Sequence, residues 1–132
     1  MLIGGTGDDV PIFDALDTLR VDGGLGLDTL RFDGAGNLNL TIPVGGHRLA
    51  GVVYTGIEQI DLDNGAANTL TLSRLDVFQL SEESNTLTIF GDTSDTVNLT
   101  GFSMGTSDGM ATPYTLGNAT LLVDDDIGMV NV

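Results

Sequence analysis

The chain has 132 residues, with 19 acidic side chains against four arginines, so its net charge is −15 at pH 7. Such a chain repels nucleic acid and anionic lipid surfaces, so neither nucleic-acid binding nor membrane insertion is expected. It contains no cysteine, which excludes disulfides and thiolate chemistry, and its length suits one domain with a modest core.

Two glycine-rich blocks near the start of the chain share the form Gly-Gly-x-Gly-x-Asp. They span residues 4–9 and 23–28 and lie 19 residues apart. Glycine adopts the positive φ angles of tight turns and lets carbonyl oxygens converge, while the closing aspartate adds a hard anionic ligand. Two such turns, stacked one above the other, predict a Ca²⁺ site.

The same 19-residue offset continues beyond the blocks, because it superposes Phe13-Asp14 on Phe32-Asp33. A repeat with glycine turns and isolated apolar residues is typical of a solenoid, in which each coil buries its inner face only against neighbouring coils. Leu30 fills the large apolar position after the second block, whereas Pro11 occupies it after the first. The strand that follows the first block is therefore predicted to be short or to lie at an edge.

A second offset, of 27 residues, relates the segments that follow. It superposes 60–62 on 87–89 and 69–72 on 96–99. An earlier copy occupies 30–40, with a turn two residues shorter, and a later copy occupies 121–132. Each copy holds two short strands with alternating apolar residues, joined by a polar turn, which predicts the stacked rungs of a parallel β-solenoid.

Two elements interrupt these rungs. Residues 73–81 have helical apolar spacing after a possible N-cap at Ser73, which predicts one short helix. Residues 113–121 predict a C-terminal hairpin around Gly117-Asn118. The stretch 103–112 is rich in glycine, serine and threonine and is expected to be a loop, and 43–53 receives no assignment. The fold class is thus all-β, a parallel β-roll or β-solenoid with one helix and one hairpin.

Catalysis within this chain is not expected. His47 is the only histidine and is placed in a surface loop, whereas a catalytic triad would need it beside an activated serine. The carboxylates lie beside glycine in turns, not on an apolar wall that would raise their pKa.

Three stretches together resemble the C-terminal end of bacterial repeat-in-toxin adhesins that are exported by type I secretion. Gly23 to Phe32 (GGLGLDTLRF) is similar to the end of a calcium-binding repeat tract. Residues 57–62 with 68–100 are similar to the module that follows such a tract. Residues 119–132 (ATLLVDDDIGMVNV) are similar to the acidic and then apolar terminus of these exported proteins.

The resemblance implies calcium-binding β-roll repeats in 1–41 and a β-solenoid-like secretion-signal module in 42–132, forming one continuous fold. Because Met1 lies directly inside a repeat, we expect the chain to be part of a longer polypeptide. Ca²⁺ is the implied cofactor, held by carbonyls and carboxylates from Gly5, Gly7, Asp9, Gly23, Gly24 and Asp28. The implied secretion signal comprises Leu121, Leu122, Val123, Asp124, Asp125, Asp126, Ile127, Val130 and Val132.

The function that follows is a non-enzymatic secretion signal and Ca²⁺-dependent folding module of a large extracellular adhesin, secreted or held on the bacterial surface and active in biofilms. Its partner would be an exporter built from an ATP-driven transporter, an adaptor and an outer-membrane channel. The module itself is expected to be a monomer. Two alternatives remain open, namely a domain that itself binds a glycan or a protein, and the β-roll tail of a secreted hydrolase.

Overall fold

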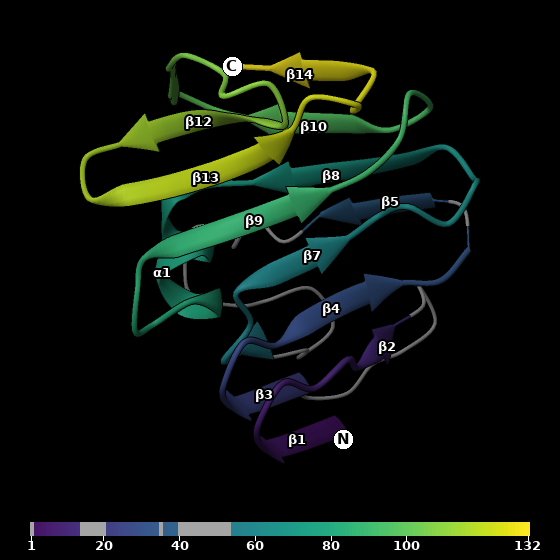
Figure 1. Cartoon of the computed structure of the whole chain (residues 1–132), viewed down its shortest axis with the longest axis vertical. Coiled ribbons are helices and arrows are strands. Elements are labelled where there is room, and N and C mark those ends of the chain that lie inside the picture. The colour runs from purple at the N-terminus through teal and green to yellow at the C-terminus, as the bar shows by residue number, and fades with distance from the viewer. Residues whose placement is uncertain (1, 14–20, 35, 40–53) are drawn as a thin grey trace.

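The computed structural model describes residues 2–13, 21–34, 36–39 and 54–132, and it forms a β-solenoid (Figure 1). Successive coils stack from the N-terminus at the bottom of the view to the C-terminus at the top. Residues 43–53, including His47, lie outside the described residues. The predicted fold class is confirmed.

The described strands form three sheets, whose orders are β1-β3-β6, β14-β10-β8-β5 and β11-β12-β13-β9-β7-β4-β2. Their pairings are parallel, apart from the antiparallel β11-β12 and β12-β13. The bounds of the first seven strands are β1 (Leu2–Thr6), β2 (Ile12–Phe13), β3 (Val21–Leu25), β4 (Thr29–Phe32), β5 (Gly36–Asn39), β6 (Tyr54–Thr55) and β7 (Gln59–Asp61). Those of the rest are β8 (Asn68–Leu72), β9 (Thr86–Phe90), β10 (Thr96–Leu99), β11 (Ser103–Met104), β12 (Ala111–Leu116), β13 (Ala119–Asp124) and β14 (Met129–Asn131).

Apolar side chains at alternate strand positions build the core in continuous columns across the coils. In the seven-stranded sheet, Leu30 pairs with Ile60, Ile60 with Ile89, and Ile89 with Val123. All four are at most 1% exposed. Since successive residues of a strand point to opposite faces, the alternation in the sequence fixes which face turns inward.

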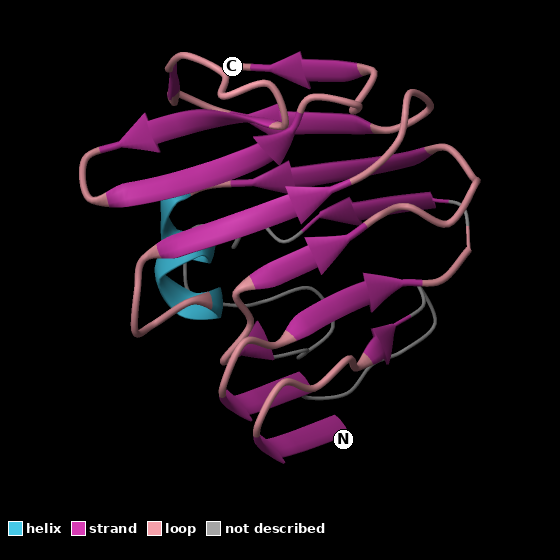
Figure 2. Ribbon diagram, viewed as in Figure 1, coloured by secondary structure: helices cyan, strands magenta, loops and turns pink. Residues whose placement is uncertain are grey.

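The helix α1 (Arg74–Leu80) follows β8 and precedes β9, so it stands where the earlier coils place a strand of the three-stranded sheet (Figure 2). Its Val77 and Leu80 are buried, while Leu75 is exposed. The Leu80 carbonyl accepts a hydrogen bond from the Ile57 N–H, next to β6. The predicted helix and its N-cap at Ser73 are confirmed, and the helix closes the upper edge of that sheet.

The predicted strand equivalences hold except at one place. Thr69–Leu72 pairs with Thr96–Leu99 at the expected 27-residue offset, and Leu121 pairs with Leu87. However, Ile60 pairs with Ile89 rather than with Leu87, so the offset there is 29. A slip of two residues leaves the same side chains facing the core, so the apolar pattern does not distinguish the two registers. Between paired positions, the connection from Phe90 to Thr96 is correspondingly two residues shorter than the connection from Asp61 to Thr69.

Three local predictions have different outcomes. The strand after the first glycine block, β2, is short and lies at a sheet edge, as Pro11 indicated. It has two residues and is the last strand of the seven-stranded sheet. The hairpin at Gly117 is confirmed. The expected loop over 103–112 is shorter than predicted, because Ser103–Met104 pairs with Tyr114 and Thr115, and β12 already begins at Ala111. These strand residues are largely exposed and lack the alternation that would have identified them.

Candidate functional site

The two Gly-Gly-x-Gly-x-Asp turns lie directly on top of each other in neighbouring coils. Gly5 pairs with Gly24 across β1 and β3, and the Gly7 N–H donates to the Leu25 carbonyl at 2.8 Å. Gly5, Gly7 and Gly24 have φ angles of +127°, +102° and +103°, which only glycine adopts without strain. The predicted stacking of the two turns is therefore present in the structure.

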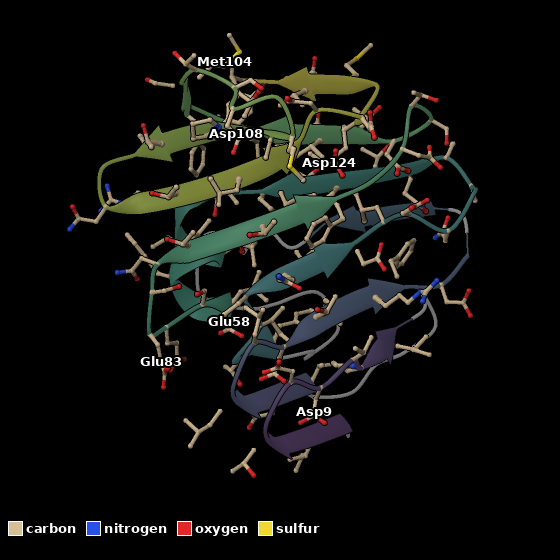
Figure 3. The ribbon with its side chains drawn as sticks, viewed as in Figure 1. Asp9, Glu58, Glu83, Met104, Asp108 and Asp124 are labelled. Carbon is tan, nitrogen blue, oxygen red and sulfur yellow. The ribbon has the colours of Figure 1, made fainter. Side chains whose placement is uncertain are left out.

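The closing aspartates link the coils through the backbone. The Asp28 Oδ1 atom accepts a hydrogen bond from the Asp9 N–H at 2.8 Å. The Asp8 Oδ1 atom accepts one from the Leu27 N–H at 3.0 Å, which adds a second bridge between the same turns. Asp28 is fully buried, whereas Asp9 is partly exposed at the N-terminal end of the stack (Figure 3).

Oxygen atoms converge beside the first glycine of each turn. A Cβ on Gly4 would lie 2.2 Å from the Gly23 carbonyl oxygen and 2.5 Å from the Asp9 Oδ2 atom. A Cβ on Gly23 would lie 1.9 Å from the Gly56 carbonyl oxygen and 2.7 Å from the Asp28 carboxyl carbon. Beside Gly4 and beside Gly23, one carboxylate thus lies next to one carbonyl oxygen of the next coil, and we call each of these two groups a cradle. Glycine is the residue that leaves room for the oxygen atoms.

One carboxylate oxygen has no partner within the protein. The Asp28 Oδ2 atom is buried and makes no hydrogen bond. Leaving a buried polar atom unpaired costs about 1–3 kcal/mol, and more when it is charged. An oxygen-only cradle with an orphaned carboxylate oxygen fits a hard cation such as Ca²⁺. Among the described residues, no three His, Cys, Asp or Glu side chains gather as a metal group, so carbonyl oxygens would have to complete the ligand set.

Sequence reasoning missed Glu58, which continues the column of acids into the third coil. The Glu58 Oε2 atom accepts a hydrogen bond from the Asp28 N–H at 3.0 Å. Burial, opposed by this hydrogen bond and reinforced by the nearby charges of Asp28 and Glu83, raises the pKa of Glu58. Its turn, Gly56-Ile57-Glu58, lacks the glycine motif, but its acid directly precedes a strand, as Asp28 does.

The predicted secretion-signal residues lie at the opposite end of the solenoid, in β13, the following turn and β14. Leu121, Val123 and Ile127 are buried in the core, while Asp125 and Asp126 are exposed. The remaining members are partly or largely exposed, namely Leu122, Asp124, Val130 and Val132. The buried apolar members are inaccessible to another protein while this region is folded.

A hollow of about 440 Å³ lies beside the turn after β13, with Asp108, Asp124, Asp125 and Asp126 on its wall and Met110 among its apolar lining. The Asp108 Oδ1 atom accepts from the N–H groups of Met110 and Ala111, which lowers the pKa of Asp108. The Asp125 carboxylate accepts from the hydroxyls of Ser107 and Thr112. The Asp108 and Asp125 carboxylates thus stabilise turns through hydrogen bonds, whereas the Asp28 Oδ2 atom makes none.

A substitution at Gly23 tests the cradle. Gly23→Ala is expected to destabilise the chain by about 1–3 kcal/mol, because its Cβ would overlap the Gly56 carbonyl oxygen and the Asp28 side chain. It should also weaken any Ca²⁺ response, which thermal unfolding with and without Ca²⁺ measures. Gly65→Ala is the control, since its φ of +75° makes the change cost about 1 kcal/mol while its Cβ meets open space. Equal Ca²⁺ responses in the two variants would contradict the cradle.

The chain significantly matches no protein-family model, no curated protein and no solved structure. Among the described residues, no helix has the length and apolar character required to cross a membrane. Functional inference therefore depends on the geometry of the turns and on the sequence pattern.

Proposed function

We propose that this chain is a non-enzymatic module that folds on binding Ca²⁺ and carries a C-terminal signal for type I secretion, as part of an extracellular repeat-in-toxin adhesin. The observation that carries the proposal is the buried, unpartnered Asp28 Oδ2 atom, at the end of the second of two stacked glycine turns. Asp9 and Asp28 would supply carboxylates to the ion, with carbonyl oxygens from the glycines around them. When bound, Ca²⁺ supplies positive charge that offsets the mutual repulsion of these carboxylates.

The energetic consequence would be a sizeable share of the stability of such a domain. Extracellular calcium modules have affinities of about 10⁻⁴–10⁻³ M, so their sites stay empty at the low Ca²⁺ concentration inside a cell. A site at 100 times its dissociation constant adds about 2.7 kcal/mol to the free energy of unfolding. Domains of this size are stable by only about 5–15 kcal/mol. One or two such sites would therefore bias the chain towards the unfolded state inside the cell and the folded state outside.

This bias would suit export, because the buried signal residues Leu121, Val123 and Ile127 are accessible only in the unfolded chain. An exporter would read them before Ca²⁺ is available. Folding outside would then bury them in the core and oppose return through the channel. Cation binding at one end of the solenoid would thus control, through folding, the accessibility of the signal at the other end.

An export assay tests the secretion part. The whole chain, fused to the C-terminus of a passenger, should direct the passenger into the medium of cells that carry a type I exporter. Replacing Asp124, Asp125 and Asp126 together by asparagine should lower export several-fold, because the acidic part of the signal is lost. Purified variant with unchanged circular dichroism would show that folding is intact. Exporter-independent release, or no release at all, would contradict the signal.

A further inference from the structure

We propose that the second and third coils hold a second divalent-cation site, formed by the Asp28 carboxylate, the Gly56 carbonyl oxygen and Glu58. It rests on the proposed Ca²⁺-dependent folding, but it assigns the buried side of Asp28 to a different ion from the one beside Asp9. No glycine repeat marks this third turn, because Gly56-Ile57-Glu58 is three residues shorter than the turns below it.

The backbone shows that Glu58 is the structural equivalent of Asp28 one coil further on. Asp28 accepts the Asp9 N–H through Oδ1, and Glu58 accepts the Asp28 N–H through Oε2. The carbonyl pattern repeats as well, since the Thr29 N–H donates to the Asp9 carbonyl at 2.9 Å and the Gln59 N–H donates to the Asp28 carbonyl at 3.0 Å. The acidic column therefore has three rungs and two intervals between them.

Each interval has its own cradle of oxygen atoms. The lower one places the Asp9 Oδ2 atom and the Gly23 carbonyl oxygen beside Gly4. The upper one places the Asp28 carboxylate and the Gly56 carbonyl oxygen beside Gly23. The same relation between a glycine, an acid and the next carbonyl thus occurs twice, so one ion for each interval follows from the geometry.

The interval between Asp28 and Glu58 has the stronger need for a cation. Gly23 and Asp28 are buried, and the Asp28 Oδ2 atom has no hydrogen-bond partner, whereas the lower cradle lies at the more exposed end of the stack. Buried charges in proteins are paired or coordinate metals. Because the donors are carboxylate and carbonyl oxygens only, the site favours a hard cation, and a flexible ligand set of this kind suits Ca²⁺ better than the octahedral Mg²⁺.

Calorimetric titration of the whole, chelator-treated chain with CaCl₂ tests the proposal, and the expected stoichiometry is two ions per chain. Glu58→Gln should lower it to one, while its amide oxygen can still accept the Asp28 N–H and so keep the turn folded. Asp9→Asn should also leave one ion, at the other interval. Glu82→Gln is the matched control, because Glu82 is exposed and lies near α1, and it should still bind two ions.

The possible failures are distinguishable. Two ions in Glu58→Gln, or one ion in the native chain that Glu58→Gln keeps and Asp9→Asn loses, would overturn the second site and leave the proposed Ca²⁺-dependent folding intact. No bound ion in the native chain would overturn both. Circular dichroism of Glu58→Gln monitors its folding. If that variant does not fold, Asp9→Asn decides, because an ion that remains in Asp9→Asn supports the upper site and the loss of every ion overturns it.

Discussion

Replacing Asp28 by asparagine is expected to abolish most of the rise in unfolding temperature that Ca²⁺ gives the native chain. Asp28 lies between the two cradles, and its buried Oδ2 atom has no partner within the protein. A single site at 100 times its dissociation constant adds about 2.7 kcal/mol, which corresponds to roughly 10 °C for a domain of this length. In Asp28→Asn that increase should shrink to a few degrees, as measured by thermal unfolding in Ca²⁺ and in chelator.

The matched control is Asp33→Asn, in the same coil, because Asp33 is an exposed aspartate that follows β4 instead of preceding it. It should keep the full Ca²⁺ response. Without Ca²⁺, Asp28→Asn should be no less stable than the native chain, since the change removes an unpaired buried charge. A Ca²⁺ response of native size in Asp28→Asn would contradict the assignment of Asp28 to a cation.

The second large effect is expected at the opposite ends of the strands, where Asn68 joins neighbouring coils without a metal. Its Nδ2 atom lies 2.9 Å from the Ala66 carbonyl, 3.1 Å from the Leu62 carbonyl and 3.2 Å from the Asp95 Oδ1 atom. Asn68→Asp would exchange this donor for a carboxylate among acceptors. Asn68 and Asp95 are both at least 98% buried. We expect a loss of about 3–5 kcal/mol.

Chemical denaturation of Asn68→Asp, with and without Ca²⁺, should give the same loss under both conditions, because no cation cradle is involved. Asn98→Asp is the control, since Asn98 is only partly buried and its Oδ1 atom already accepts from Asn131. That change should cost less than about 1 kcal/mol. A loss for Asn68→Asp that disappears in Ca²⁺ would show that a cation also binds at this end.

The turns at the two ends of the strands therefore differ in how their oxygen atoms are paired. Stacked turns direct carbonyl and carboxylate oxygens towards one another, and each group needs a donor or a cation. Around Asn68, the amide nitrogen donates to these oxygens from within the chain, while the Asn68 Oδ1 atom is itself buried without a partner. Around Asp28, the corresponding partner is missing from the protein. We propose that a cation takes this place at Asp28, so that folding depends there on the Ca²⁺ concentration of the surroundings.

The sequence predicted the solenoid because its inward positions repeat: Leu30 and Leu70 lie in apolar columns that the alternation identifies directly. It also predicted the stacking of the two glycine turns. It placed Ile60 against Leu87 instead of Ile89, since a slip of two residues keeps the same faces buried. Glu58 was missed because its shorter turn has no glycine motif, and its equivalence to Asp28 depends on backbone pairing between coils.

Thermal unfolding of the native chain in excess chelator and in millimolar Ca²⁺, followed by far-ultraviolet circular dichroism, tests the central claim most directly. We predict an unfolding midpoint that rises with Ca²⁺ by roughly 10 °C or more, according to whether one or both cradles are occupied. Equal concentrations of Mg²⁺ should give a much smaller rise, because Mg²⁺ requires near-ideal octahedral geometry. Unfolding curves that superimpose in chelator and in Ca²⁺ would contradict a calcium-dependent fold.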